Sequence, residues 1–181
     1  MATCLATSGR LEPCKEFVGG LYKVWFGNFG LVNTTTGATI QEIGGFSGAT
    51  TLYEYELKGT SKLTQELTSS RDGGTTFVKQ TLTLNLKGGD AATANEIKLL
   101  SYGRPHAFVQ DNYGNNVLIG KERGCEVLTA IHDTGAQMGD PYGYTLTIEG
   151  QEKIFGPFVK GATLALPFGT LTIAPTITKG T

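Results

Sequence analysis

The sequence predicts a mainly β protein: an antiparallel β-sandwich or barrel with one packed α-helix at about 90–102 and extended terminal arms. Three observations support this prediction. Apolar and polar residues alternate with a period of two over many short runs. Clusters of Gly, Asn and Asp separate these runs at roughly 8–12-residue spacing, as in sandwiches and barrels. Only one stretch combines a helix cap with a series of strong helix formers.

Strand alternation is clear at 52–58, where apolar and aromatic residues lie on one face and charged residues on the other. The charged face carries Glu54, Glu56 and Lys58. After a turn at Gly59-Thr60, the run 61–68 continues the alternation. The sequence therefore predicts a β-hairpin over 51–70 with one charged side.

Further strands are expected on both sides of this hairpin. The turn cluster Arg71–Gly74 precedes a long alternating run at 75–86. The other expected strands are 19–29, 106–111, 116–120, 125–133 and 142–150. Strands at this spacing favour two packed sheets or a closed barrel over a helical fold.

One segment breaks the alternation and predicts the helix. Asp90 is a suitable N-cap, and the residues after it are rich in Ala, Glu, Lys and Leu. Ile97 and Leu100 lie on one face at the spacing that packs a helix onto a sheet. Gly103 is expected to end the helix in the left-handed conformation.

The two ends of the chain differ from the middle. We expect an N-terminal arm at 1–17, a sandwich domain at 18–155, and a C-terminal arm or added strand at 156–181. The last segment has three prolines and only two charged residues, and its apolar side chains alternate with threonines. The alternating apolar positions include Leu171, Ile173 and Ile177. Such a segment is either donated to a neighbouring subunit or added to its own sheet, and the sequence leaves both open.

Composition argues against several classes of protein. Fifteen basic and sixteen acidic residues give a net charge of −1, without the basic excess of duplex-binding proteins. No apolar run approaches the roughly 20 residues of a membrane helix, and the start lacks a secretory signal pattern. We therefore expect no membrane partner. The three cysteines are an odd number without metal-site spacing, which fits synthesis in a reducing cytoplasm.

Groups that could perform catalysis are sparse. The two histidines, His106 and His132, lie in no nucleophile or metal-binding motif. The segment Asp111–Asn116 lacks the spaced acidic residues of a calcium loop and is predicted as a hairpin turn. Four Gly-Gly pairs form no phosphate-binding motif. We expect no enzyme, no cofactor and no metal, and instead a structural or binding protein.

The order of the expected elements resembles that of the tail tube (major tail) proteins of tailed bacteriophages. The resemblance covers roughly 18–155: alternating strands, a Gly-rich turn, the long strand, one capped helix and further strands. The opening is similar to the starts of virion structural proteins from phages of Bacteroidetes hosts. That part of the sequence is Cys4 to Arg10, followed by Pro13-Cys14-Lys15 and Val18-Gly19-Gly20.

The resemblance implies a virion protein that is made in the host cytoplasm and built into the tail. Its copies would form hexameric rings whose sheets join into one barrel, with the helix outside. Stacked rings would form a tube that conducts double-stranded DNA during ejection without binding it specifically, and would contact other tail or head–tail proteins. The hairpin 51–70 and the arms 1–17 and 156–181 would reach adjacent rings. The residues expected at subunit contacts are Glu54, Glu56, Lys58, Leu171, Ile173 and Ile177.

Two other functions stay open. Another virion ring or cement protein, such as a tail terminator, a connector or a capsid decoration protein, would share this composition. A carbohydrate-binding β-sandwich module would need exposed aromatic residues on one face. The candidates for that role are Tyr53, Tyr55, Tyr142 and Tyr144. Their alternation in step with aliphatic neighbours favours burial in a core or interface.

Overall fold

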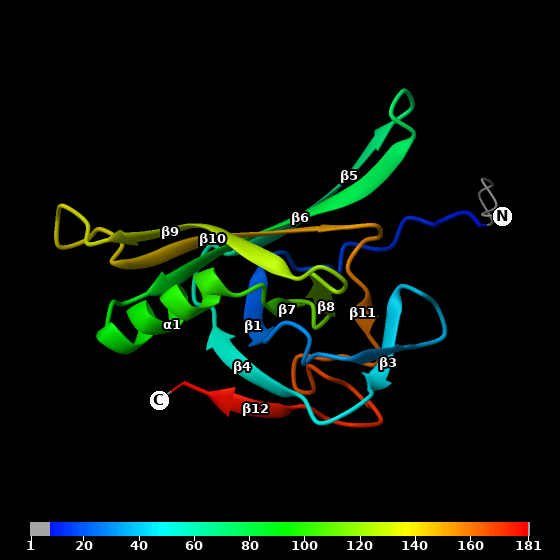
Figure 1. Cartoon of the computed structure of the whole chain (residues 1–181). Helices are drawn as coiled ribbons and strands as arrows, with labels where there is room; N and C mark the ends of the chain where they lie inside the picture. The colour runs from blue at the N-terminus through cyan, green and yellow to red at the C-terminus, as the bar shows by residue number, and fades with distance from the viewer. Residues whose placement is uncertain (1–7, 181) are drawn as a thin grey trace.

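The computed structural model describes residues 8–180, which fold into two packed β-sheets and one helix (Figure 1). The elements are β1 (Leu21–Gly27), β2 (Thr34–Thr36), β3 (Glu42–Phe46), β4 (Thr51–Glu56), β5 (Lys62–Ser70), β6 (Thr75–Lys87), α1 (Ala91–Tyr102), β7 (His106–Asp111), β8 (Asn116–Ile119), β9 (Cys125–Asp133), β10 (Gly143–Glu152), β11 (Phe158–Val159) and β12 (Thr176–Lys179). The predicted fold class is confirmed, and the arrangement is the sandwich. Residues 1–7 of the expected N-terminal arm and residue 181 lie outside the described residues.

The larger sheet has eight strands in the order β12-β4-β1-β7-β8-β11-β3-β2, and the smaller sheet has four in the order β5-β6-β10-β9. All paired strands are antiparallel except β11–β3 and β12–β4, which are parallel. Both exceptions involve strands that follow residue 155. A long intervening chain permits parallel pairing, and these strands return to the sheet more than a hundred residues after their partners.

The predicted hairpin over 51–70 is wrong. β4 pairs with β1 and β12 in the larger sheet, whereas β5 pairs with β6 in the smaller one. The segment 57–61 crosses between the sheets because its ends are buried: Leu57 lies in the core, and Ser61 Oγ accepts a hydrogen bond from Asn85 N at 3.1 Å. The hairpin in this region is β5–β6, with its tip at Arg71–Gly74 and Gly74 at a φ of +60°.

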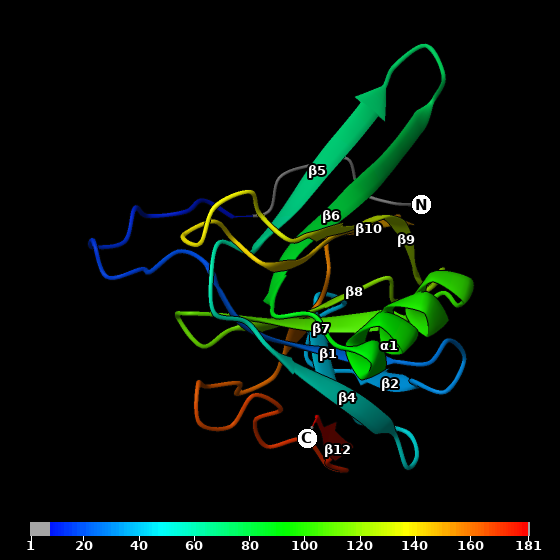
Figure 2. The ribbon, with the colours of Figure 1, turned by 90° about the vertical axis from the view of Figure 1, so that its left-hand side faces the viewer.

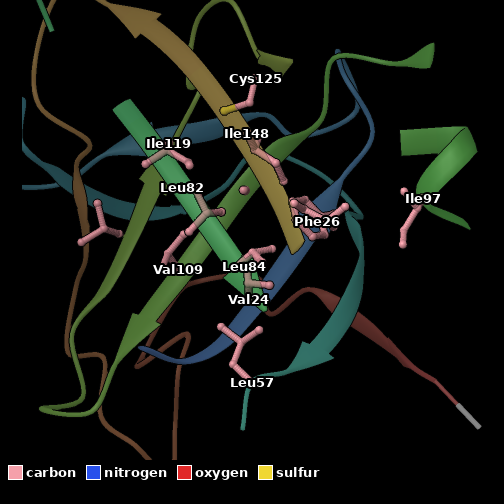
Figure 3. Close-up of a cluster of buried hydrophobic side chains, with 13 residues drawn as sticks. Val24, Phe26, Leu57, Leu82, Leu84, Ile97, Val109, Ile119, Cys125 and Ile148 are labelled. Carbon is pink, nitrogen blue, oxygen red and sulfur yellow. The ribbon is translucent and has the colours of Figure 1, made fainter. Parts of the chain in front are cut away.

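The main core lies between the two sheets (Figure 3). Alternate residues of β1, β7 and β8 face alternate residues of β6 and β10, and all of these side chains are buried. They are Val24, Phe26, Ala107, Val109, Val117, Ile119, Leu82, Leu84, Leu146 and Ile148. Burial of each aliphatic side chain contributes about 1.5–3 kcal/mol, so this layer holds the sheets together.

Helix α1 packs on the main core through Ile97, which is buried, and Leu100, which is partly buried. The predicted helix and its cap are confirmed, since Asp90 Oδ1 accepts a hydrogen bond from Thr93 N at 2.6 Å. The prediction for Gly103 is wrong, because its φ is −95° and its backbone is extended. The chain leaves the helix directly toward β7, without a left-handed turn.

A second core lies on the other face of the larger sheet. On β1, β7 and β8, the side chains that alternate with those of the main core point to this other face and are buried as well. They are Trp25, Phe108 and Leu118. They pack with Val32, Ile43, Phe46, Leu52, Val159 and Phe168. Central strands buried on both faces are continuous apolar runs, as in Val24-Trp25-Phe26 and Val117-Leu118-Ile119.

The C-terminal segment covers the second core. The ring of Phe168 lies edge-on to Trp25 and Phe108, with centroids 5.2 and 5.3 Å away. Leu171 and Ile177 pack against the same cluster, and Ile177 lies opposite Leu52 in the β12–β4 pair. In this structure the segment therefore adds to its own sheet, which is the second of the two alternatives left open by the sequence.

We predict that Phe168→Ala destabilises the subunit by about 3–5 kcal/mol, because it opens a cavity against Trp25 and Phe108. Leu166→Ala is the matched control, since Leu166 is exposed in the same segment and the change should cost less than about 0.5 kcal/mol. Urea denaturation of both variants measures the difference. Equal losses would show that the segment does not seal a core.

Candidate assembly surfaces

The first question for a candidate site is whether the described residues bring metal-ligating or reactive side chains together. Within residues 8–180, no three His, Cys, Asp or Glu side chains lie close enough together to hold a metal ion. No helix in the same range is long and apolar enough to cross a membrane. Cys125 is buried, and burial raises the pKa of its thiol to about 12, so this group is unreactive at neutral pH.

Both histidines make contacts that hold loops or strands. His106 is buried; its Nδ1 donates to Gly120 O at 2.6 Å, and its Nε2 accepts from Gly30 N at 3.4 Å. Burial is the main cause that lowers the pKa of His106, which keeps the ring neutral for these two contacts. His132 is exposed and stacks on Tyr144 with ring centroids 4.5 Å apart.

The smaller sheet ends in two open edges, β5 and β9. Each is nine residues long, and no other strand among residues 8–180 pairs with their outer sides. β5, β6, β10 and β9 alternate in direction because each neighbouring pair is antiparallel, so the two edges run in opposite directions. Helix α1 contacts β9, but no strand among the described residues covers either edge. Long edges without a strand partner can template pairing with another chain.

The strands of the smaller sheet are offset along their length. β5 pairs with residues 75–83 of β6, whereas β9 aligns through β10 with residues 80–87. The sheet is therefore sheared, as the strands of a closed barrel must be. As a result, the β5–β6 hairpin extends beyond one end of the body and the β9–β10 hairpin beyond the other (Figures 1 and 2).

The outer face of the smaller sheet is rich in threonine. These side chains alternate with those of the main core, so they point away from it. They are Thr64, Thr81, Thr83, Thr129, Thr145 and Thr147. Thr83, Thr147 and Thr129 are directly opposite one another across three strands. Lys79 and Glu149 form an ion pair on the same face at 3.0 Å, so charge there is partly balanced.

Glu54, which we expected at a subunit contact, has its charge compensated inside the subunit. Its carboxylate accepts from Lys23 Nζ and from Trp25 Nε1, both at 2.9 Å, and its side chain is 7% exposed. Burial alone would raise the pKa of this carboxyl. The hydrogen bonds from Lys23 and Trp25 outweigh that effect, so the pKa of Glu54 is lower than usual.

The other expected contact residues differ in accessibility. Glu56 and Lys58 are exposed, and Glu56 forms ion pairs with Lys23 at 3.4 Å and with Lys58 at 4.0 Å. Ile173 is exposed, whereas Leu171 and Ile177 pack on the second core. Glu56, Lys58 and Ile173 are thus accessible at the surface, although Glu56 and Lys58 are already paired within the subunit. Sequence reasoning did not identify the edges β5 and β9, because an edge is defined by pairing and not by residue type.

The four tyrosines considered for sugar binding do not form one platform. Tyr53 belongs to β4 of the larger sheet, whereas Tyr142 immediately precedes β10 of the smaller one. Tyr55 and Tyr144 pack against the main core. A flat aromatic surface of the kind that stacks on a sugar ring is therefore not made by these residues.

No protein-family model matches the chain, and no curated protein or solved structure matches it either. The candidate surfaces therefore rest on the geometry of this chain.

We predict that Glu54→Lys destabilises the subunit by about 2 kcal/mol or more, because it leaves the Trp25 indole N–H unpaired and sets two ammonium groups together. Glu56→Lys is the control; its side chain is 58% exposed, and the cost should stay below about 1 kcal/mol. Chemical denaturation compares the two variants. Similar losses would contradict a structural role for Glu54.

The contribution of Glu54 should also depend on pH. Because its pKa is lower in the folded state, the stabilisation is complete above the pKa of an unfolded glutamate and is lost as the pH falls through the folded value. The stability difference between the unmodified chain and Glu54→Gln should therefore shrink in acid. Denaturation midpoints measured from pH 7 to pH 3 test this expectation, and a constant difference would contradict it.

Proposed function

We propose that this protein is a structural subunit of a bacteriophage tail tube that assembles through its smaller sheet into rings. The observation that carries the proposal is the pair of open nine-residue edges, β5 and β9, running in opposite directions. β9 of one copy pairs with β5 of the next through main-chain hydrogen bonds, so the antiparallel sheet continues from copy to copy. Closing the ring removes both edges. A hexameric ring follows from the resemblance in element order.

The two sheets differ in their number of strands, and this difference indicates which sheet faces the axis of the proposed ring. The larger sheet has eight strands and the smaller four, so a ring of subunits closes most readily with the smaller sheet toward its axis. The threonine-rich face then lines the channel. Hydroxyl groups and paired charges offer no excess of cations to DNA phosphates, which favours passage without binding.

The β5–β6 hairpin supports stacking of rings. It projects from the body (Figure 2), and its exposed positions include Leu67 and Phe77. A hydrogen bond between Ser69 Oγ and Thr76 Oγ1, at 3.1 Å, links the strands close to the tip. This hairpin takes the role that the sequence had suggested for 51–70. The other virion rings considered above would use the same edges without stacking.

We predict that Ile131→Lys abolishes ring formation. Ile131 is 57% exposed on the edge strand β9, and a lysine there places an unpaired charge in the strand-pairing interface. Leu166→Lys is the matched control, because Leu166 is 60% exposed in the segment between β11 and β12, outside the smaller sheet. Sedimentation should give a 19.2 kDa monomer for Ile131→Lys only. Rings of normal size from both variants would contradict the proposed pairing.

We predict that shortening the β5–β6 hairpin separates ring formation from stacking. Replacing 69–76 by Asn-Gly keeps a two-residue hairpin turn and removes the projecting tip. Single rings should form, and tubes should not. The control is the Arg71→Ala/Asp72→Ala variant, which retains the length of the hairpin. Negative-stain microscopy distinguishes monomers, rings and tubes, and tubes of normal length from the shortened chain would contradict this role.

A further inference from the structure

Two fully buried amide side chains lie between the larger sheet and the C-terminal segment. Gln110 on β7 and Asn116 on β8 are directly opposite in the β7–β8 pair. They occupy the same face as Phe108 and Leu118, which is the face of the second core. Gln110 Nε2 donates to Thr163 O at 2.8 Å, and Asn116 Nδ2 donates to Pro167 O at 2.7 Å. The two amides thus hold the C-terminal segment against the sheet.

The oxygen atoms of the same two amides are not matched by protein donors. Gln110 Oε1 and Asn116 Oδ1 are buried and accept no hydrogen bond from any residue in the range 8–180. Rotating either amide by half a turn would not help, because it would set the oxygen against the carbonyl that the NH₂ group now contacts. Buried polar atoms without a partner are rare in native proteins, and each requires an explanation.

Three donors of the turn between β7 and β8 are engaged by Asp111. The backbone N–H groups of Gly114 and Asn115, in the turn between β7 and β8, donate to Asp111 Oδ1 at 2.7 and 2.8 Å. Asn115 Nδ2 donates to the other oxygen of that carboxylate at 3.1 Å. These three donors are committed to the Asp111 carboxylate, so they are not directed at the two amide oxygens. A ligand here must supply hydrogen-bond donors to two neutral acceptors.

We propose that Gln110 Oε1 and Asn116 Oδ1 bind one buried water molecule, which donates one O–H group to each. Directly opposite residues of an antiparallel pair have Cβ atoms about 4.5–5.5 Å apart, so one small molecule can reach both side chains. Water brings two donors and no charge, as the site requires. This water links the two amide side chains that hold the C-terminal segment against the larger sheet. This inference does not depend on the function proposed above.

A high-resolution structure of the full chain, by crystallography or by microscopy of its assemblies, tests the proposal. We expect a solvent peak about 2.7–3.2 Å from both oxygens. Gln80 is an internal control: it is also buried, but its Oε1 already accepts from Gly120 N at 2.9 Å. The peak should be lost in Gln110→Met and kept in Gln80→Met. No peak in the unmodified chain would overturn the proposal.

Ion replacement distinguishes water from a monovalent cation. Unfolding midpoints in sodium, potassium and choline chloride at equal ionic strength should coincide, because water binding does not depend on the cation. A specific shift in one of these salts, or an anomalous peak at the site after soaking with rubidium, would overturn the proposal in favour of a cation site. If Gln110→Met does not fold, the two measurements on the unmodified chain still decide between these outcomes.

Discussion

The burial of both faces of β1, β7 and β8 is the constraint on which the rest of the structure depends. Trp25 and Phe108 point away from the smaller sheet, so that sheet cannot cover them. Another part of the chain must do so, and β3, β4 and the C-terminal segment meet that need. Covering one layer on both faces leaves the smaller sheet as the outermost layer. The outer face of the smaller sheet and its two edge strands therefore have no covering layer of strands among the described residues.

The Glu54 network shows how a polar requirement is met inside this arrangement. An indole buried in the second core needs an acceptor, and β4 supplies it directly opposite Trp25 in the β1–β4 register. Lys23, two residues away on β1, completes the neutralisation. Alternation along 52–58 correctly separated charged from apolar positions but could not indicate that one of the carboxylates lies inside the subunit.

Local sequence signals predicted where the strands and the helix lie better than they predicted which strands pair with each other. The long strands and the helix after Asp90 follow from residue periodicity and capping, which depend only on near neighbours. β2, β3 and β11 were missed because they are short, and β3 contains Gly44-Gly45. The turn signal at Gly59-Thr60 was real, but burial of Leu57 on one side directs the chain to another sheet. The open edges follow only from the pairing of distant strands.

The sequence separation within the second core has a consequence for synthesis. Phe168 and Val159 leave the ribosome more than a hundred residues after Trp25. During translation, Trp25 and Phe108 stay uncovered on this face of the larger sheet until residues 159–168 have been made. Completion of the second core is thereby delayed until well after its central strands have been synthesised. A truncated product exposes Trp25 and Phe108, which makes it a substrate for chaperones and proteases before it can join an assembly.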